Sequence, residues 1–234
     1  MLGQLYRPRG LALETAQAVL ETEQVFACNV AFGCSNSCLY CYVPRFTRRR
    51  RDACEVRLPA KPPVELVQHQ LEHQWRFNWT SKLGVFLSFL TDPFLPKLKD
   101  ETEKLISYLL DQGVTVATLS KLDVSGYYVK HGMTLVSLDG AFWEKFEPLT
   151  MTPRSRIKSL EMCKGAWHEY VWVSMEPFPT SAIYPQKIED ILEEMKFVDF
   201  ILFGKWNYDK RANDIQAKEE YRQIVPQFVD WCKS

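Results

Sequence analysis

The sequence predicts an α/β protein built as a partial, open barrel of about six parallel β/α units. Apolar runs of strand length alternate with helical segments along most of the 234 residues. These runs lack the alternation typical of a half-buried strand, so both faces of the sheet are expected to be covered, as in parallel sheets. Six units are too few to close an eight-unit barrel, which favours an open one.

The boundaries of these elements follow from apolar periodicity, prolines and glycines. We interpret residues 1–24 as a lead-in segment and residues 25–234 as the barrel core. Strands are predicted at Val25–Phe32, Val85–Leu90, Val114–Leu119, Met133–Leu138, Tyr170–Met175 and Val198–Phe203. Helices are predicted at Pro62–Trp79, Lys97–Leu110, Val124–His131, from about Arg154 to Lys164, Gln186–Met195 and Asp214–Trp231. Gly132 and Gly165 are interpreted as helix stops.

The composition indicates a packed, soluble, enzyme-like domain. Lys plus Arg equals Asp plus Glu at 29 each, and 46% of the residues are hydrophobic. This neutrality argues against coating nucleic acid by bulk charge, although a local basic patch remains open. No apolar run approaches the length of a membrane span, and the seven cysteines suit a reducing compartment. We therefore expect a cytoplasmic protein.

Three cysteines follow the first predicted strand, at Cys34, Cys38 and Cys41. Each iron of a four-iron cluster takes one cysteine, so three ligands without a fourth leave one iron open to a group that is not protein. The alternative is a structural zinc site, which normally closes with four ligands in two pairs. No second pair with that spacing follows nearby, and His69 and His73 are expected on the surface of a helix.

Polar side chains follow every predicted strand, where the chemistry of parallel barrels gathers. Any one of these groups is also typical of a helix cap or a turn. Together they predict a polar-lined cavity large enough for a nucleoside-sized cofactor. Besides the cysteine loop, they are Ser88–Asp92, Ser120 and Lys121, Ser137–Asp139, Ser174 with Glu176, and Lys205–Asn207.

The cysteine spacing, with Tyr40 just before the third cysteine, resembles the radical SAM superfamily, in which S-adenosylmethionine chelates the open iron. Five segments are more narrowly similar to the spore photoproduct lyase-like (DNA repair photolyase-like) family, and they span most of the chain. They are Tyr6–Gly10, Gly33–Tyr42, the strand end at Thr91 and Asp92, Ser174–Pro177, and Phe203–Tyr208.

This resemblance implies roles for individual residues. Cys34, Cys38 and Cys41 would bind a four-iron four-sulfur (4Fe-4S) cluster, reduced by an external electron donor of flavodoxin or ferredoxin type. Tyr40 would lie against the adenine of S-adenosylmethionine, and Tyr42 aligns with a tyrosine implicated in passing a hydrogen atom. The other expected cofactor-binding residues are Thr91, Lys121, Ser137, Ser174 and Glu176.

The chain departs from the family at the hydrogen-atom donor. The lyase has a cysteine in the strand before the Ser/Thr-Asp pair, and the alignment on Thr91 places Phe89 there. Repair of a thymine dimer would then lack its donor. Cys54, beside the basic segment, is the candidate replacement, because basic surroundings favour a thiolate. Cys28 and Cys163 are interpreted as buried or helix-surface thiols.

Three hypotheses for the function remain open. In the first, the chain reductively cleaves S-adenosylmethionine to a 5′-deoxyadenosyl radical, which takes a hydrogen atom from a nucleic acid or nucleotide. In the second, the same radical acts on a small metabolite or peptide. In the third, the chain is a non-catalytic, metal-stabilised module that binds RNA or a protein. Phosphate contacts are expected from a basic segment that could equally be a solvated loop: Arg45, Arg48, Arg49, Arg50 and Arg51.

Overall fold

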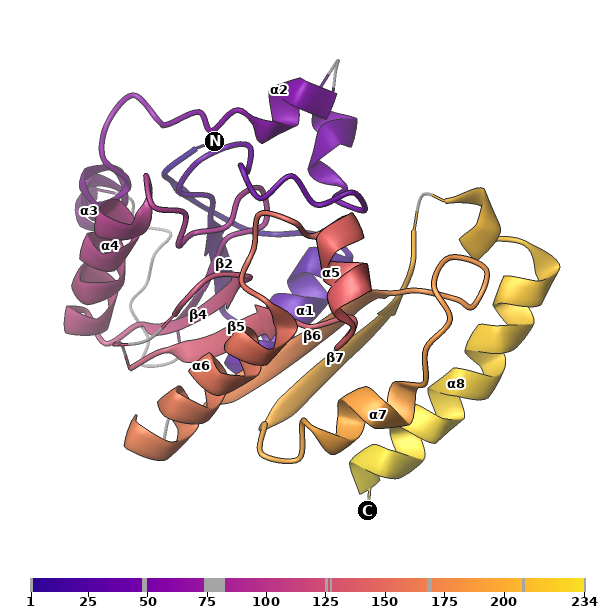
Figure 1. Cartoon of the computed structure of the whole chain (residues 1–234). Helices are drawn as coiled ribbons and strands as arrows, with labels where there is room; N and C mark the ends of the chain where they lie inside the picture. Colours follow the sequence, from indigo (N-terminus) through magenta and orange to yellow (C-terminus); the bar gives the residue numbers. More distant parts are fainter. Residues whose placement is uncertain are drawn as a thin grey trace.

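The computed structural model describes residues 2–47, 50–73, 83–124, 126, 128–167, 170–207 and 209–233. They contain one seven-stranded sheet whose strands lie side by side in chain order (Figure 1). Strands β2 to β7 run parallel, and β1 is antiparallel to β2. The strands are β1 (Leu5–Tyr6), β2 (Val25–Cys28), β3 (Gly84–Leu87), β4 (Thr115–Ser120), β5 (Lys130–Thr134), β6 (Val171–Phe178) and β7 (Phe200–Lys205). The predicted partial, open parallel β/α barrel is confirmed.

Helices cover both faces of this sheet, with α1 on the opposite side from α6 (Figure 1). The helices are α1 (Leu11–Leu20), α2 (Arg50–Cys54), α3 (Pro63–His73), α4 (Lys99–Asp111), α5 (Gly140–Phe146), α6 (Pro153–Trp167), α7 (Ile188–Glu193) and α8 (Ile215–Lys233). Two 3-10 turns are η1 (Val43–Phe46) and η2 (Lys210–Ala212). Within the described ranges, none of the helices is long and apolar enough to cross a membrane.

Strand residues alternate between two apolar cores. In β3, Val85 and Leu87 face the larger core, which contains α4 and α6, whereas Phe86 faces a smaller core on the inner side. There Phe86 meets Val19 of α1 and Trp172 of β6. The lead-in segment therefore contributes both an edge strand and the helix that fills the inside of the partial barrel.

The link between β4 and β5 differs from the prediction. A helix was expected over Val124–His131, but the described residues of this link are not helical, and Lys130 begins β5. Gly132, interpreted as a helix stop, instead lies inside β5. A glycine is required at this position because the Trp172 ring fills the space of a side chain: a Cβ on residue 132 would lie 2.1 Å from the ring. Gly165, the other expected stop, lies inside α6.

Other boundaries shift by a few residues, and one strand and two helices were missed. The strand β1 is very short. Helix α2 lies in the basic segment that was interpreted as a loop or arm, and α5 lies where no helix was predicted. The predicted helix Pro62–Trp79 is described only as far as His73.

A Gly132→Ala substitution should destabilise the protein by about 1–3 kcal/mol, the usual cost of overpacking a core. The added methyl group would overlap the fully buried ring of Trp172. Urea denaturation followed by circular dichroism measures this loss. Gly140→Ala is the matched control, since the added Cβ would meet no atom within 4 Å among the described residues, apart from its chain neighbours and its own helix backbone. Equal unfolding free energies for the two variants would contradict the explanation.

Candidate functional site

A cavity of about 540 Å³ lies where the parallel strands end. The segment around Arg9 and helix α1 form one wall, the cysteine loop forms another, and residues such as Phe86 and Leu202 contribute apolar surface. Ten of the eleven residues predicted for the site line this single cavity: Cys34, Cys38, Tyr40, Cys41, Tyr42, Cys54, Thr91, Lys121, Ser174 and Glu176.

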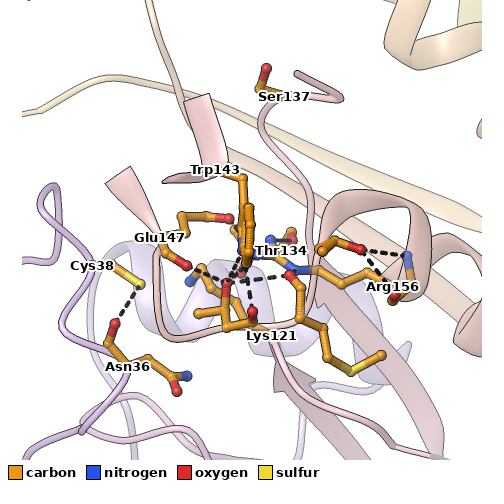
Figure 2. Close-up of polar contacts among 12 residues, drawn as sticks. Asn36, Cys38, Lys121, Thr134, Ser137, Trp143, Glu147 and Arg156 are labelled. Carbon is orange, nitrogen blue, oxygen red and sulfur yellow. Dashed lines mark hydrogen bonds and ion pairs between the residues drawn. The ribbon is translucent and has the colours of Figure 1, made fainter. Parts of the chain in front are cut away.

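Ser137 is the residue that the structure does not bring into the cavity lining. It is buried beyond the end of β5, and its hydroxyl accepts a hydrogen bond from the Asp139 N–H at 3.2 Å. Figure 2 shows it apart from Lys121 and Cys38. The Ser137 hydroxyl thus stabilises the turn that leads into α5.

The basic segment can be placed only in part. Arg45 is exposed in η1 and does not line the cavity. Arg48 and Arg49 lie outside the described residues, and α2 begins at Arg50. The phosphate-binding role expected for this segment stays a prediction.

Backbone hydrogen bonds hold the start of the cysteine loop. The Gly33 N–H donates to the Leu90 carbonyl at 3.1 Å, and the Cys34 N–H donates to the Ala53 carbonyl at 2.8 Å. Gly33 has a φ of 85°, and a Cβ there would lie 2.2 Å from the Glu55 carbonyl oxygen. Only glycine lets the chain pass this close to the end of α2.

Asp92 connects this loop to two strands. Its Oδ2 accepts hydrogen bonds from Asn36 Nδ2 and from the Lys121 N–H, both at 2.9 Å. Its Oδ1 accepts from the Ser120 hydroxyl at 2.7 Å and from the Phe94 N–H at 3.1 Å. The carboxylate, 7% exposed, thereby joins the cysteine loop to the ends of β3 and β4.

Asn29 makes a similar connection that the sequence did not reveal. Its Oδ1 accepts from the N–H groups of Phe89 and Leu90, and its Nδ2 donates to the Tyr6 hydroxyl at 2.9 Å. An isolated amide in the apolar run Val25–Phe32 was the available signal, because a buried polar group there needs partners.

Two of the cysteine thiols, those of Cys34 and Cys38, sit in a desolvated environment. Burial raises the pKa of Cys34 to about 11 and that of Cys38 to about 12. The positive charge of Lys121 opposes both shifts, whereas the charge of Asp92 adds to the rise at Cys34. Metal ions bind thiolates, so loading this loop with iron must release protons.

Next to Tyr40 lies a buried ion pair that was not predicted from the sequence. Figure 2 labels its two members, Glu147 and Arg156. The Tyr40 hydroxyl donates to Glu147, whose other oxygen accepts from Arg156 Nη2 at 2.5 Å. The two charged side chains are 2% and 1% exposed. Burial raises the pKa of Glu147, and the charge of Arg156 opposes that rise.

Phe89 occupies the position where the resemblance would place a donor cysteine. Phe89 lines the cavity and stacks on Phe86, with ring centroids 4.6 Å apart. The Tyr42 hydroxyl donates to the Phe89 carbonyl oxygen. Cys54 lines the same cavity from the end of α2, so it lies in the compartment where a replacement donor was expected.

The residues present fit a cluster with a bound nucleoside cofactor. The Thr91 hydroxyl is buried in the cavity wall and has no hydrogen-bond partner among the described residues, as expected of a group that meets a ligand. No group of three or more His, Cys, Asp or Glu side chains within the described ranges converges on a single metal ion. A cluster does not require such convergence, because each cysteine binds a different iron.

Three comparisons relate the chain to known proteins, and only the comparison with solved structures bears on the fold. No family model matches the chain. Among curated proteins it is similar to an uncharacterized protein of Acidianus two-tailed virus, with 25% identity over 196 residues, which are 76% of this chain and 63% of that protein.

Among solved structures the chain is similar to spore photoproduct lyase. A cysteine-to-alanine variant with dinucleoside spore photoproduct aligns with a TM-score of 0.55 and 14% identity, over 86% of this chain and 60% of that one. A tyrosine-to-phenylalanine variant aligns with a TM-score of 0.56 and 13% identity, over 89% and 69%. The chain thus has the partial β/α barrel of spore photoproduct lyase, and it spans less than two thirds of the length of the first of these structures.

Proposed function

We propose that this chain is a radical SAM enzyme that binds a 4Fe-4S cluster through Cys34, Cys38 and Cys41 and S-adenosylmethionine in the adjoining cavity. One observation carries the proposal: all three cysteines line the same cavity of about 540 Å³ as the Thr91 hydroxyl, which no described residue hydrogen-bonds. The fold shared with spore photoproduct lyase supports it. When bound, the cluster and cofactor would supply an electron and a 5′-deoxyadenosyl radical for hydrogen abstraction.

The chain's own residues would bind and orient the cofactor. The Lys121 ammonium suits a carboxylate as a compact point charge. The Thr91 hydroxyl, without a partner in the described part of the chain, could hydrogen-bond the cofactor. Ser174 and Glu176 extend the polar lining on β6, and burial raises the pKa of Glu176. The apolar surface of Phe86 and Leu202 would exclude water from a reactive species.

The first experiment measures cleavage of S-adenosylmethionine. Protein reconstituted under anaerobic conditions is reduced with dithionite and mixed with S-adenosylmethionine but no substrate. It should form 5′-deoxyadenosine, which mass spectrometry detects. Cys38→Ala should abolish this product, because a cluster ligand is lost. Cys232→Ala, at an exposed thiol in α8, is the matched control and should retain full activity. If iron-loaded wild-type protein forms no deoxyadenosine, the proposal is wrong and the non-catalytic, metal-stabilised module is favoured.

A nucleic acid or nucleotide is the substrate class that the cavity mouth favours. Phe46 and Tyr42 line the cavity, are 65% and 39% exposed, and lie edge to face with centroids 6.2 Å apart. Arg9 lines the same cavity. Exposed aromatic rings beside a guanidinium suit the stacking of a base and contact with a phosphate. A small metabolite or peptide is the alternative.

Phe46→Ala should weaken binding of a single-stranded oligonucleotide by about fivefold to a hundredfold, the range for loss of one stacked base. Fluorescence anisotropy at fixed ionic strength measures the dissociation constant. Tyr128→Ala removes an equally exposed aromatic ring that does not line the cavity, and it should bind like wild type. Equal affinities for all three proteins would favour the metabolite or peptide substrate.

A further inference from the structure

The middle of the cysteine loop is attached to helix α5 by two hydrogen bonds. The Leu39 N–H donates to the Phe146 carbonyl at 2.9 Å, and the Tyr40 hydroxyl donates to Glu147. Phe146 ends α5, and Glu147 follows it directly. Cys38 and Cys41 flank the attached residues in sequence, so this contact determines where their half of the loop lies.

The Glu147 carboxylate is itself held in one orientation. Arg156 Nη2 binds its Oε2, and the same guanidinium donates to the Thr134 carbonyl at 2.8 Å and the Met151 carbonyl at 2.9 Å. Arg156 comes from α6, and Thr134 from the end of β5. The carboxylate oxygen that faces Tyr40 is therefore fixed by two elements of the barrel rather than by a mobile side chain.

Two further contacts define the plane of the Tyr40 ring. Trp206 approaches it edge-on, with centroids 5.2 Å apart, and Lys121 Nζ lies 5.4 Å from the ring centroid. Of these three residues, Tyr40 and Lys121 line the cavity, and Trp206 packs against Tyr40. A hydroxyl anchor that also controls the tilt of this ring would set the shape of the cavity beside the cysteines.

We propose that Glu147 is a positioning residue: with Arg156 it orients Tyr40 and thereby preorganises the Cys38–Cys41 half of the loop. The inference rests on the proposed function for its purpose, since a preorganised loop is what cluster and cofactor binding requires. It concerns contacts within the chain, so it can be tested without any cofactor.

The test uses the cofactor-free, reduced protein and measures alkylation of each cysteine by iodoacetamide with peptide mass spectrometry. Cys38 is 6% exposed, so it should react only when the loop opens. Tyr40→Phe removes one hydrogen bond to a charged acceptor and should speed alkylation of Cys38 roughly tenfold or more. Cys28 and Cys163, 0% and 1% exposed in the core, should keep their wild-type rates.

Two more variants separate positioning from general stability. Glu147→Asp keeps the charge that faces Arg156 but shortens the reach to Tyr40, so it should speed alkylation of Cys38 as much as Tyr40→Phe does. The double variant, Tyr40→Phe with Glu147→Asp, should show no further increase in that rate. Tyr184→Phe removes a hydroxyl that donates to the exposed Asp139 at the other end of α5, and it should leave Cys38 at its wild-type rate. If Glu147→Asp does not fold, the alkylation rate of Cys38 in Tyr40→Phe alone tests the inference.

Two results would overturn the inference: an unchanged alkylation rate of Cys38 in Tyr40→Phe, or an equal acceleration of Cys28 and Cys163, which would indicate global opening. In the reconstituted enzyme, Tyr40→Phe should raise the KM for S-adenosylmethionine more than it lowers kcat. A selective effect on Cys38 in a chain that never cleaves the cofactor would retain the positioning role and reject the proposed function.

Discussion

Arg156→Met is expected to lower the unfolding free energy by about 3–5 kcal/mol, the cost of leaving a buried charge without its partner. Glu147 would keep a carboxylate that is 2% exposed and has lost its ion pair. The carbonyl groups of Thr134 and Met151 would lose their donors as well. Urea denaturation followed by circular dichroism should show a much lower midpoint with an unchanged slope.

Helix α6 offers a matched control for this loss. Arg154 pairs with Glu194 at 3.0 Å, but its side chain is 69% exposed, so Arg154→Met should cost less than about 1 kcal/mol. A double variant, Arg156→Met with Glu147→Gln, should recover part of the stability, because the unpaired charge is removed. Equal losses for Arg156→Met and Arg154→Met would contradict a special role for the buried pair.

The parallel strands were predictable because their environment imposes a simple pattern. Residues in β3 such as Val85 and Phe86 are buried against opposite cores, so every position is apolar and the run is easy to recognise. The first part of β5, before Met133, has no such signal. Its Gly132 suits the strand only because Trp172, a residue distant in sequence, fills the space above it. Local sequence cannot distinguish that glycine from a helix stop.

The residues of the candidate site also fall into those that local sequence predicts and those that it does not. The cysteine loop and Thr91 were found because their spacing and position at strand ends carry local information, and the structure brings them into one cavity. Glu147 and Arg156 could not be found, since charged residues on a helix or beside one are usually solvated. Their burial depends on contacts with Tyr40 and Thr134, which no short sequence window contains.

Asp92→Asn is expected to destabilise the protein by about 3–6 kcal/mol and to prevent stable iron loading. An amide keeps one acceptor oxygen, so two of the four donors around Asp92 would face an NH₂ group instead, and each lost bond to a charged acceptor costs about 1.5–3 kcal/mol. Asn36 is among those donors, so the cysteine loop would lose its link to β3 and β4. Denaturation midpoints and iron content per chain measure the two effects.

The matched control is Asp139→Asn, at an exposed carboxylate that caps α5 by accepting from the Ala141 N–H at 2.9 Å. It should cost about 1 kcal/mol or less and leave iron loading unchanged, since it lies outside the cavity lining. If Asp92→Asn loads iron as fully as this control does, the cysteine loop holds its shape without the carboxylate. Asp92 would then stabilise the strand ends only, and the organisation of the cluster site would rest on the backbone contacts of Gly33 and Cys34.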